Sequence, residues 1–361
     1  MYNKALEVLN NFYSHGYVAY IVGGYPRDMI LGIDTNDIDI CTNAKPKEII
    51  EIFSNDIVSD VGYGSVKIIY KKCKFDVTTF RKDIKYENNR KPVKIKYVND
   101  IKKDLLRRDF TINTICIDKD GKIIDLLNAK SDIHNGIVRT VGNPRYRLKE
   151  DSLRILRAIR FAVNLDFQID DKTKYYIKKY GYLLKKLSSS RKREEIDKIL
   201  TSKNKEKGRK LLIELDLCKY LGINNLDKIV LCDDIIGIWS QLDLSINYPF
   251  TKIELDSIKK IRELLNLEIN KANIYKYGLY IACVVGSIKK ISYKTINKMY
   301  KELPINTRKD IKINGLDIKN IIGNNKNIKI KDVYDDVTIK ILNDKLENDR
   351  DKLIKYIENN Y

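Results

Sequence analysis

The signals for β-strands in this chain stop near residue 140, and this change of pattern limits the folds that are open to it. Up to that point, short runs of apolar and β-branched residues alternate with segments of helical spacing. From Asn143 onward, apolar residues recur at helical spacing almost to the end of the chain, as in Leu153, Leu156 and Ile159. We therefore expect an α+β fold, in which a mixed α/β head is followed by an all-helical part. The expected strands are residues 17–22, 37–41, 65–70, 74–79, 113–118 and 136–140.

The length and the charge of the chain indicate several domains and a polyanionic partner. With 361 residues, the chain is long enough for two or three hydrophobic cores. Its 69 Lys and Arg residues exceed its 49 Asp and Glu residues, and the net charge of +20 is spread along the sequence. Such an excess is typical of proteins that bind nucleic acid, although a lysine-rich surface without a partner would show it too.

Cysteine usage and hydropathy indicate a cytosolic protein. The cysteines form no C-x-x-C pair and several stand in apolar contexts, which is typical of reduced core thiols; they are at positions 41, 73, 116, 218, 232 and 283. No apolar stretch of the sequence approaches the length of a membrane span, and the first residues predict an amphipathic helix rather than a signal peptide. We therefore expect a cytoplasmic location.

A glycine pair after the first expected strand has the pattern of a phosphate-binding turn. The strand-like run Val18–Val22 is followed at once by Gly23 and Gly24, which let the backbone come close to a ligand. Arg27 then falls on the first turn of the next helix, where free N–H groups already favour an anion. A glycine pair alone is more often a plain turn, so the order and spacing of the motifs carry the argument.

Two aspartates in the second expected strand have the spacing of a metal site. Asp37 and Asp39 are two residues apart, so a strand points both carboxylates to one face. Two such carboxylates repel each other, whereas a bound Mg²⁺ makes the pair favourable, as in phosphoryl-transfer enzymes. Asp76, in the strand expected at 74–79, could add a third carboxylate. The alternative for all three is an acidic residue on a solvated strand or loop.

Two arginine-rich segments could bind the rest of a nucleotide. Arg107 and Arg108 place two guanidinium groups beside the carboxylate of Asp109, a combination able to bind phosphate or a ribose hydroxyl. Further along, four polar residues step by three and are expected on one face of one helix; they are Asp151, Arg154, Arg157 and Arg160. A structural network of ion pairs would have the same composition in both segments.

Together these motifs resemble the class II tRNA nucleotidyltransferases, the CCA-adding enzymes, a branch of the polymerase-beta-like nucleotidyltransferase superfamily. The resemblance is strongest over residues 20–42, 104–113 and 150–161, in the order of the family, and it weakens after about residue 200. It implies four domains: a catalytic head at 1–140, a neck at 141–200 that selects the nucleotide, a helical body at 201–270, and a helical tail at 271–361 that binds tRNA.

The resemblance also implies a role for each motif. Asp37 and Asp39 would be the Mg²⁺ ligands and would act in catalysis together with Asp76. Asp151 and Arg154 would serve as a protein template that hydrogen-bonds the Watson–Crick edge of CTP or ATP. The full set expected to bind the nucleotide is Gly23, Gly24, Arg27, Arg107, Arg108, Asp109, Asp151, Arg154, Arg157 and Arg160.

The implied reaction is the addition of C, C and A to the 3′ end of tRNA from CTP and ATP, with Mg²⁺ and without a nucleic-acid template. The terminal ribose hydroxyl would attack the α-phosphorus and pyrophosphate would leave, so no side-chain nucleophile is required. His15 and His134 lie outside the motifs, and we expect them on the surface or in packing contacts.

Three positions depart from the family pattern. Pro26 replaces the usual Val before the motif arginine, which suits the first turn of a helix. Residues 82–91 resemble the flexible loop of the family, and the usual acid of that loop is Asn88 here. In the neck, Ser190 replaces the first acid of a later motif, so the internal pairing of the neck could differ.

Two groups of alternatives remain open. A bacterial poly(A) polymerase, or an enzyme that adds only CC or only A, would share the same catalytic head. The segment Gly62–Val66 is more similar to the CCA-adding pattern than to the arginine-rich segment of the polymerases. A catalytically silent RNA-binding protein is the alternative of a different class, and the intact acidic and template motifs disfavour it.

Overall fold

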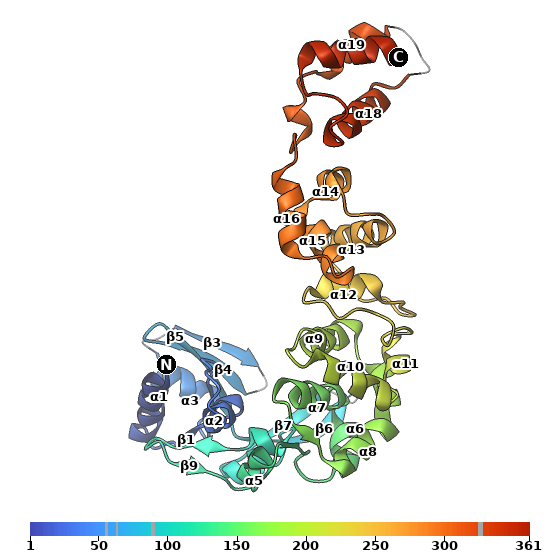
Figure 1. Ribbon diagram of the computed structural model, residues 1–361. Helices are drawn as coiled ribbons and strands as arrows, with labels where there is room; N and C mark the ends of the chain where they lie inside the picture. Colours follow the sequence, from blue (N-terminus) through green and yellow to red (C-terminus); the bar gives the residue numbers. More distant parts are fainter. Residues whose placement is uncertain (55–56, 63, 88–90, 324–327) are drawn as a thin grey trace. The chain divides into compact units, whose positions relative to one another are not determined.

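The structure is a computed structural model that describes residues 1–54, 57–62, 64–87, 91–323 and 328–361 (Figure 1). The chain forms two compact units. The first contains Met1–Asp227 and Asp243–Pro249, and the second contains Lys228–Leu242 and Phe250–Tyr361. The strands of the described residues lie in the first unit, so the expected α+β class with a mixed head and a helical remainder is confirmed.

The head is built on a seven-stranded sheet. Strand β2 (Asp39–Thr42) lies between β1 (Ala19–Val22), which is antiparallel to it, and β5 (Cys73–Thr79), which is parallel to it. The strand order is β3-β4-β5-β2-β1-β8-β9, and the outer strands are β3 (Ile57–Gly62), β4 (Ser65–Tyr70), β8 (Cys116–Ile117) and β9 (Ile123–Ile124). The parallel register places Asp39 directly opposite Asp76.

Two helices, α1 (Tyr2–Ser14) and α3 (Pro46–Ile52), share one hydrophobic core with this sheet (Figure 1). The amphipathic helix expected at the start of the chain is confirmed as α1, which buries Ala5, Val8, Leu9 and Phe12. These side chains belong to the same core as Ile38 and Ile40. Because side chains alternate along an extended chain, the aspartates next to these isoleucines point away from the core.

Several segments differ from the sequence expectations. Residues 82–91, which resemble a flexible loop, contain most of β6 (Arg81–Glu87), and β6 pairs with β7 (Lys91–Tyr97) in a separate antiparallel sheet. The strand expected at 113–118 is shortened to β8, because the 3₁₀ helix η1 (Thr111–Asn113) occupies its start.

One short strand lies in the region expected to be all-helical. This strand is β11 (Gln168–Ile169). It pairs in parallel with β10 (Ile137–Val138), which lies within the strand expected at 136–140. Strands of two residues carry too little periodicity to be distinguished in the sequence.

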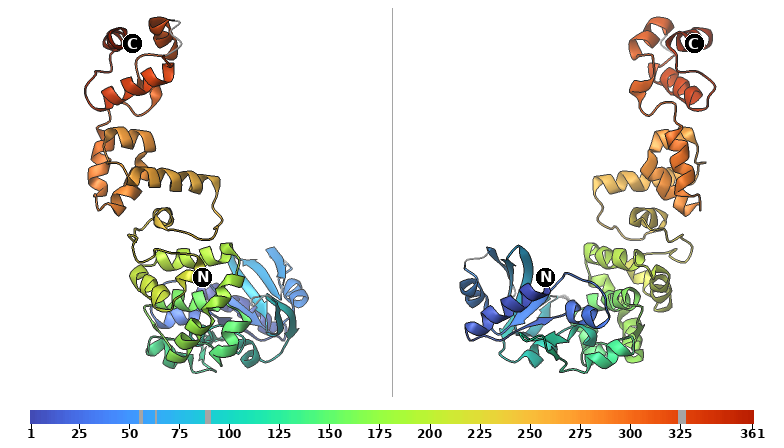
Figure 2. Two further views of the ribbon diagram at one scale, coloured as in Figure 1. Left: turned by 90° about the vertical axis from the view of Figure 1, so that its right-hand side faces the viewer. Right: turned by 60° about the vertical axis from the view of Figure 1, so that its left-hand side comes forward.

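The rest of the first unit is mostly helical and lies beside the head (Figure 2). Helix α7 (Leu153–Asn164) contacts α9 and α10 and is the helix that reaches the site described below. The other helices of this unit are α2 (Gly24–Ile30), α4 (Ile101–Leu105), α5 (Ala129–His134), α6 (Pro144–Glu150), α8 (Asp171–Tyr180), η2 (Gly181–Lys186), α9 (Ser189–Leu200), α10 (Lys205–Glu214) and α11 (Cys218–Leu221).

The second unit consists of helices with their own buried contacts. Its single tryptophan, Trp239, is buried and packs edge-on against Phe250, with ring centroids 5.4 Å apart. The helices of this unit are α12 (Ile235–Gln241), α13 (Lys252–Leu265), α14 (Lys271–Tyr277), α15 (Leu279–Ile288), α16 (Tyr293–Lys301), η3 (Arg308–Asp310), α17 (Gly315–Ile322), α18 (Ile330–Leu342) and α19 (Arg350–Asn360).

The cysteines and histidines lie as expected. All six cysteines are free thiols, of which Cys41, Cys116 and Cys232 are buried and the others are partly buried. His15 and His134 are exposed, away from the motifs. Among the helices of the described residues, none combines the length and the apolar character needed to span a bilayer.

Candidate active site

A cavity of about 350 Å³ in the first unit brings most of the predicted site residues together. The glycine turn, the aspartate pair, the segment after α4 and helix α7 each contribute to its walls. Its lining residues are Gly23, Gly24, Arg27, Asp28, Thr35, Asp37, Asp39, Arg108, Asp109, Asn113, Arg157, Arg160 and Phe161. Four predicted residues do not line it, namely Asp76, Arg107, Asp151 and Arg154.

Gly23 is required at the turn between β1 and α2 for two reasons. Its backbone φ is +90°, a conformation that favours glycine. In addition, a Cβ atom at this position would lie only 3.2 Å from Oδ2 of Asp39. The turn therefore lies directly against the acidic pair, because the register of β1 and β2 pairs Val22 with Asp39.

The aspartate pair has the alternation predicted from the sequence. Asp37 and Asp39 are exposed, while Ile38 and Ile40 are buried, so both carboxylates point to the same side. The strand itself begins later than expected, at Asp39, and Asp37 precedes it. The pKa of Asp39 is raised to about 6 because its carboxylate loses hydration in the cavity and feels the charge of Asp37, whereas Arg108 opposes the rise.

The acidic residues fit a divalent cation only when other ligands complete the site. Within the described ranges, no cluster of three or more His, Cys, Asp and Glu side chains is placed to hold a metal ion. Asp76 is exposed on β5 opposite Asp39 and contributes to the raised pKa of Asp39. Two oxygen-donor side chains that repel each other fit a hard cation whose remaining ligands are water and phosphate oxygens.

The arginines near the glycine turn are held by hydrogen bonds to neighbouring side chains. Arg27 is buried, and it donates from Nη1 to Oδ1 of Asn113 at 2.6 Å and from Nε to Oδ1 of Asp28 at 2.8 Å. Arg108 donates to Oδ2 of Asp104 at 3.2 Å. The guanidinium groups thus stay in fixed positions at the edge of the cavity.

An ion pair joins helix α7 to the Arg-Arg-Asp segment of the head. Arg157 donates from Nε and Nη2 to Oδ2 of Asp109, at 2.8 and 2.5 Å, and Asn113 donates to Oδ1 of the same carboxylate at 3.1 Å. Burial acts to raise the pKa of Asp109, but the charge of Arg157 and the bond from Asn113 hold this pKa well below its usual range. Asp109 is therefore ionised and serves as an anchor for Arg157.

Asp151 and Arg154 do not line this cavity. The prediction that all four polar residues share one helix face is wrong for Asp151, which precedes α7 and accepts a hydrogen bond from the backbone N–H of Leu153 at 3.0 Å. An aspartate at this place stabilises the free N–H groups of a helix start. Burial raises the pKa of Asp151, and the charge of Arg154 opposes the rise. Arg154 is buried and donates to the backbone carbonyls of Arg147 and Arg107, at 3.0 and 3.1 Å.

The structure separates Arg107 from Arg108. Both arginines pair with the fully buried carboxylate of Asp104, at 2.8 and 3.2 Å respectively. Arg108 faces the acidic cavity, whereas Arg107 lines a second cavity of about 500 Å³ between β6, α4 and α6. The sequence left open which of the two would face the nucleotide, and the geometry favours Arg108.

Residues 141–200 are paired internally in spite of Ser190. Arg160 forms an ion pair with Glu195 of α9 at 2.9 Å, and Arg191 pairs with Glu194 at 2.7 Å. The acids that follow Ser190 thus supply partners for these arginines. The other departure, Asn88, lies outside the described residues, as does Tyr63 of the Gly62–Val66 segment.

Several contributors to the site were not singled out from the sequence. Asp28 and Asn113 hold Arg27, Glu195 holds Arg160, and Phe161 lines the cavity. Asp28 and Asn113 stand inside motifs that the sequence already marked, so their polar character was an available signal. Glu195 lies on a different helix from its partner, and spacing along the chain gives no indication of such a pair.

A glycine turn, an acidic pair and an arginine-lined helix around one cavity define the nucleotidyltransferase class of enzymes. Residues 19–139 match the family described as "Poly A polymerase head domain". Residues 166–224 match "Probable RNA and SrmB- binding site of polymerase A", and residues 250–357 match domain 2 of tRNA nucleotidyltransferases.

Curated relatives identify the particular family. The chain is 32% identical to the CCA-adding enzyme of Ligilactobacillus salivarius, over 98% of this chain and 95% of the relative. It is 31% identical to the CCA-adding enzyme of Anoxybacillus flavithermus, over 98% and 96% of the two chains. The chain belongs to the family of CCA-adding enzymes, and the resemblance seen in the sequence is confirmed.

Solved structures agree with this assignment. The crystal structure of the Bacillus stearothermophilus CCA-adding enzyme in complex with CTP superposes with a TM-score of 0.88 at 26% identity, covering 99% of this chain and 97% of that chain. The Thermotoga maritima CCA-adding enzyme complexed with tRNA has a TM-score of 0.70 at 22% identity, with coverage of 98% and 94%, and shares the fold.

Proposed function

We propose that this protein adds C, C and A to the 3′ end of tRNA, using CTP and ATP and releasing pyrophosphate, without a nucleic-acid template. The observation that carries the proposal is the cavity in which Asp37 and Asp39 face the arginines of α7. The curated relatives are CCA-adding enzymes, and this chain matches them along almost their whole length. Related structures hold CTP or ATP.

The nucleotide would lie with its triphosphate among the arginines of the cavity. Arg27, Arg108, Arg157 and Arg160 supply positive charge there, and Gly23 and Gly24 let the phosphates approach the backbone. Guanidinium groups held in place by Asn113, Asp104, Asp109 and Glu195 need little rearrangement to bind an anion. Asp109 would also accept a hydrogen bond from the ribose.

Enzymes of this family use a divalent metal, and we assign Mg²⁺ to Asp37 and Asp39. When bound, this ion lowers the pKa of the terminal ribose hydroxyl and neutralises charge on the phosphates. The hydroxyl oxygen of tRNA forms a bond to the α-phosphorus while the bond to pyrophosphate breaks. The side chains of the protein orient these groups, and Asp76 stands beside the pair as an additional acid.

Base selection is assigned to Asp151 and Arg154. A carboxylate accepts from an exocyclic amine, which C and A both carry, and a guanidinium donates to ring or carbonyl acceptors. U and G present a different edge. The carbonyls of Arg147 and Arg107 hold the Arg154 side chain, which makes it a rigid recognition group.

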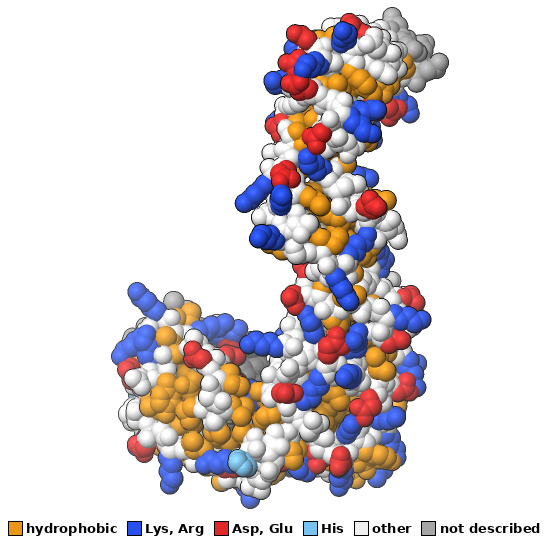
Figure 3. Space-filling model, in the orientation of Figure 1, with side chains coloured by type: hydrophobic (Ala, Val, Ile, Leu, Met, Phe, Trp, Pro, Cys, Tyr) orange, Lys and Arg blue, Asp and Glu red, His pale blue; other side chains and the backbone are white. Residues whose placement is uncertain are grey.

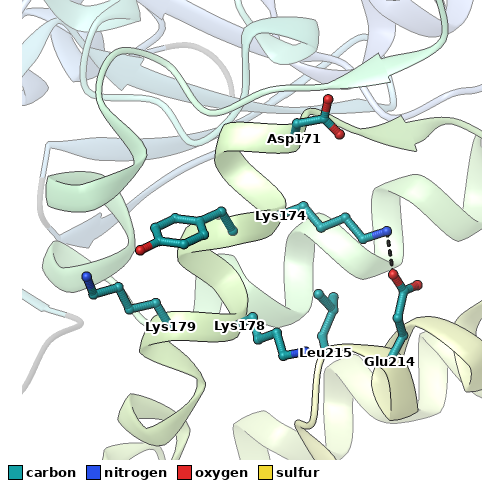
Figure 4. Close-up of a pocket in the computed structure, with 7 residues that line it drawn as sticks. Asp171, Lys174, Lys178, Lys179, Glu214 and Leu215 are labelled. Atoms are coloured by element: carbon teal, nitrogen blue, oxygen red, sulfur yellow. Dashed lines mark ion pairs between the residues drawn. The ribbon is translucent and has the colours of Figure 1, made fainter.

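The helical regions would bind tRNA through its phosphates and its shape. On the face shown in Figure 3, Lys and Arg side chains are spread over both units. Between α8 and α10, a hollow of about 540 Å³ is lined by the exposed Tyr175 with Lys178 and Lys179, while Lys174 pairs with Glu214 at 2.6 Å (Figure 4). Lysines beside an exposed aromatic ring suit an RNA backbone with an unpaired base.

The domains implied by the resemblance belong to the same proposal. We assign catalysis to the head at 1–140, nucleotide selection to the neck at 141–200, and tRNA binding to the tail at 271–361, with the body at 201–270 between them. A tRNA substrate and six free thiols fit a protein that works in the cytoplasm.

A single extension assay tests the function. Purified protein with Mg²⁺, CTP and ATP is expected to extend a tRNA that lacks its 3′ end by three nucleotides and then to stop. Each nucleotide supplied alone separates the alternatives, because long A tails indicate a poly(A) polymerase and a stop after two C residues indicates a partial enzyme. No extension with a tRNA that is still retained would support the silent RNA-binding protein.

A further inference from the structure

The aromatic ring of Phe161 is surrounded by three guanidinium groups. The Cζ atoms of Arg160, Arg157 and Arg27 lie 4.7, 5.3 and 5.4 Å from its centroid. Arg157 and Arg160 belong to α7, as Phe161 does, whereas Arg27 comes from α2 in the head. One ring at the wall of the cavity therefore contacts cations from two separate elements.

If carboxylates alone held these arginines in place, fewer of their N–H donors would be free to bind phosphate. Among the described residues, each arginine pairs with one carboxylate: Arg27 with Asp28 at 2.7 Å, Arg157 with Asp109 at 2.5 Å, and Arg160 with Glu195 at 2.9 Å. These pairs reduce the repulsion among the three cations, but they occupy N–H donors that a phosphate group could use. The face of an aromatic ring attracts a guanidinium through its quadrupole and occupies none of these donors.

The ring itself is held in place from the head. Phe161 is half-buried, and it meets the fully buried ring of Phe110 edge-on, with centroids 5.6 Å apart and an interplanar angle of 73°. Phe110 directly follows Asp109, the anchor of Arg157. The aromatic pair and the ion pair thus fix the same helix face against the same segment of the head.

We propose that Phe161 is a positioning residue for the triphosphate of the nucleotide. Its ring keeps Arg27, Arg157 and Arg160 apart and oriented, with their N–H donors available to the β- and γ-phosphates. This inference rests on the proposed function, because its ligand is a nucleoside triphosphate. Phe161 would thus raise the affinity for the phosphates although it forms no hydrogen bond with them itself.

The test compares CTP with CMP, since the two differ only in the phosphates that the arginines would bind. Binding of each nucleotide to the full chain in the presence of Mg²⁺ is measured by calorimetry for the wild type, F161L and F161Y. In F161L, which stays apolar but has no aromatic face, we expect the Kd of CTP to rise about five- to twenty-fold and that of CMP to change by less than about two-fold. F161Y retains the ring and is expected to keep the wild-type ratio of the two Kd values.

A matched control separates this effect from a loss of packing. Phe167, three residues after the end of this helix, is 7% exposed and packs beside Gly136, and no cation stands over its ring in the described part of the chain. F167L is expected to lower the stability of the fold without changing the ratio of the Kd of CTP to the Kd of CMP. If F161L loses more stability than F167L, the ratio of the Kd of CTP to the Kd of CMP is measured for F161M instead, and it tests the role of the aromatic ring in the same way.

The outcomes distinguish this inference from the function on which it rests. An unchanged ratio of the Kd of CTP to the Kd of CMP in F161L or F161M, or an equal rise of this ratio in F161Y or F167L, would overturn the positioning role. If the same wild-type preparation binds CTP and extends tRNA, such a result leaves the proposed function standing. A wild type that neither binds CTP nor extends tRNA would overturn both.

Discussion

The acidic and the basic side of the cavity are stabilised in opposite ways. On the basic side, Arg27, Arg157 and Arg160 each have a carboxylate partner between 2.5 and 2.9 Å away. On the acidic side, Asp37 and Asp39 are exposed, and the loss of hydration with the neighbouring charge raises the pKa of Asp39 to about 6. The protein's own charges prepare the basic side, whereas the acidic pair repels itself and, under the proposed function, would be stabilised by a bound cation. Substitutions on the two sides should therefore have different effects on activity and on stability.

The largest effect is expected on the acidic side. Asp37→Asn or Asp39→Asn should lower nucleotide incorporation by at least about 10³-fold, because the metal that we propose at these residues would lose a charged ligand. Folding stability should stay the same or rise slightly, since the substitution removes a repulsion. Incorporation assays and denaturant unfolding measure the two effects, and tRNA binding serves as a check on the fold. Asp34→Asn, a change of an exposed aspartate outside the cavity, is the control that should retain full activity. More than a tenth of the activity left in the Asp39 variant would contradict the metal assignment.

On the basic side, removing one anchor should affect activity and stability together. Asp109→Asn leaves Arg157 without its counter-ion, and we expect a loss of about 2 kcal/mol in the free energy of unfolding and roughly 10²-fold in incorporation. In the double variant with Arg157→Gln the loss of stability should be smaller than the sum of the two single losses. Additive losses would show that the pair is not coupled.

The stability contributed by Asp109 should depend on pH in a defined direction. Its folded pKa lies below the unfolded value of about 3.9, so the folded state favours the ionised form. The contribution is therefore fully present above that unfolded value and is lost as the pH falls toward the folded pKa. The difference in unfolding free energy between wild type and Asp109→Asn should stay constant from about pH 5 to 8 and narrow below about pH 4. A gap that widens in acid would contradict this sign.

The turn where the two sides meet should show a smaller effect. Gly23→Ala combines an unfavourable φ of +90° with a Cβ 3.2 Å from Oδ2 of Asp39, and we expect roughly tenfold lower incorporation and about 1–2 kcal/mol lower stability. Gly32→Ala is a matched control, because Gly32 has a φ of +67° but open space around its Cβ. A similar loss of activity in both variants would assign the effect to backbone strain rather than to contact with the acidic pair.

The smallest effect on turnover is expected behind the basic side. Asp151→Ala and Arg154→Lys should raise incorporation of U or G about tenfold relative to C, while turnover with CTP falls only a few-fold. The reason is that these two residues are assigned to the base edge and do not line the cavity of the acidic pair. Single-nucleotide extension assays with the four triphosphates measure the selectivity. A loss of turnover with unchanged selectivity would place these residues in a purely structural role.

The parts of the fold that were predicted correctly depend on local patterns. β4 and β5 were anticipated because six or seven residues show clear apolar alternation, and the shared direction of Asp37 and Asp39 follows from the period of two. β6 was missed because Lys and Asp interrupt its sequence, and β11 was missed because it is only two residues long. Backbone pairing with a neighbouring strand, rather than local propensity, holds such segments in the extended form.

Residue types and their spacing predicted the glycine turn, the shared direction of the acidic pair and the helix that follows, because a turn, a strand and a helix each impose a short-range period that the chain displays directly; the family followed from the resemblance of these motifs to the CCA-adding enzymes. Which groups meet across the fold was decided by packing alone: Arg157 with Asp109, Arg160 with Glu195, and three arginines around Phe161. The same holds for the separation of Arg107 from Arg108, although they are adjacent in the chain. Pairings of this kind depend on the three-dimensional distance between elements, and the order of residues along the chain does not give this distance.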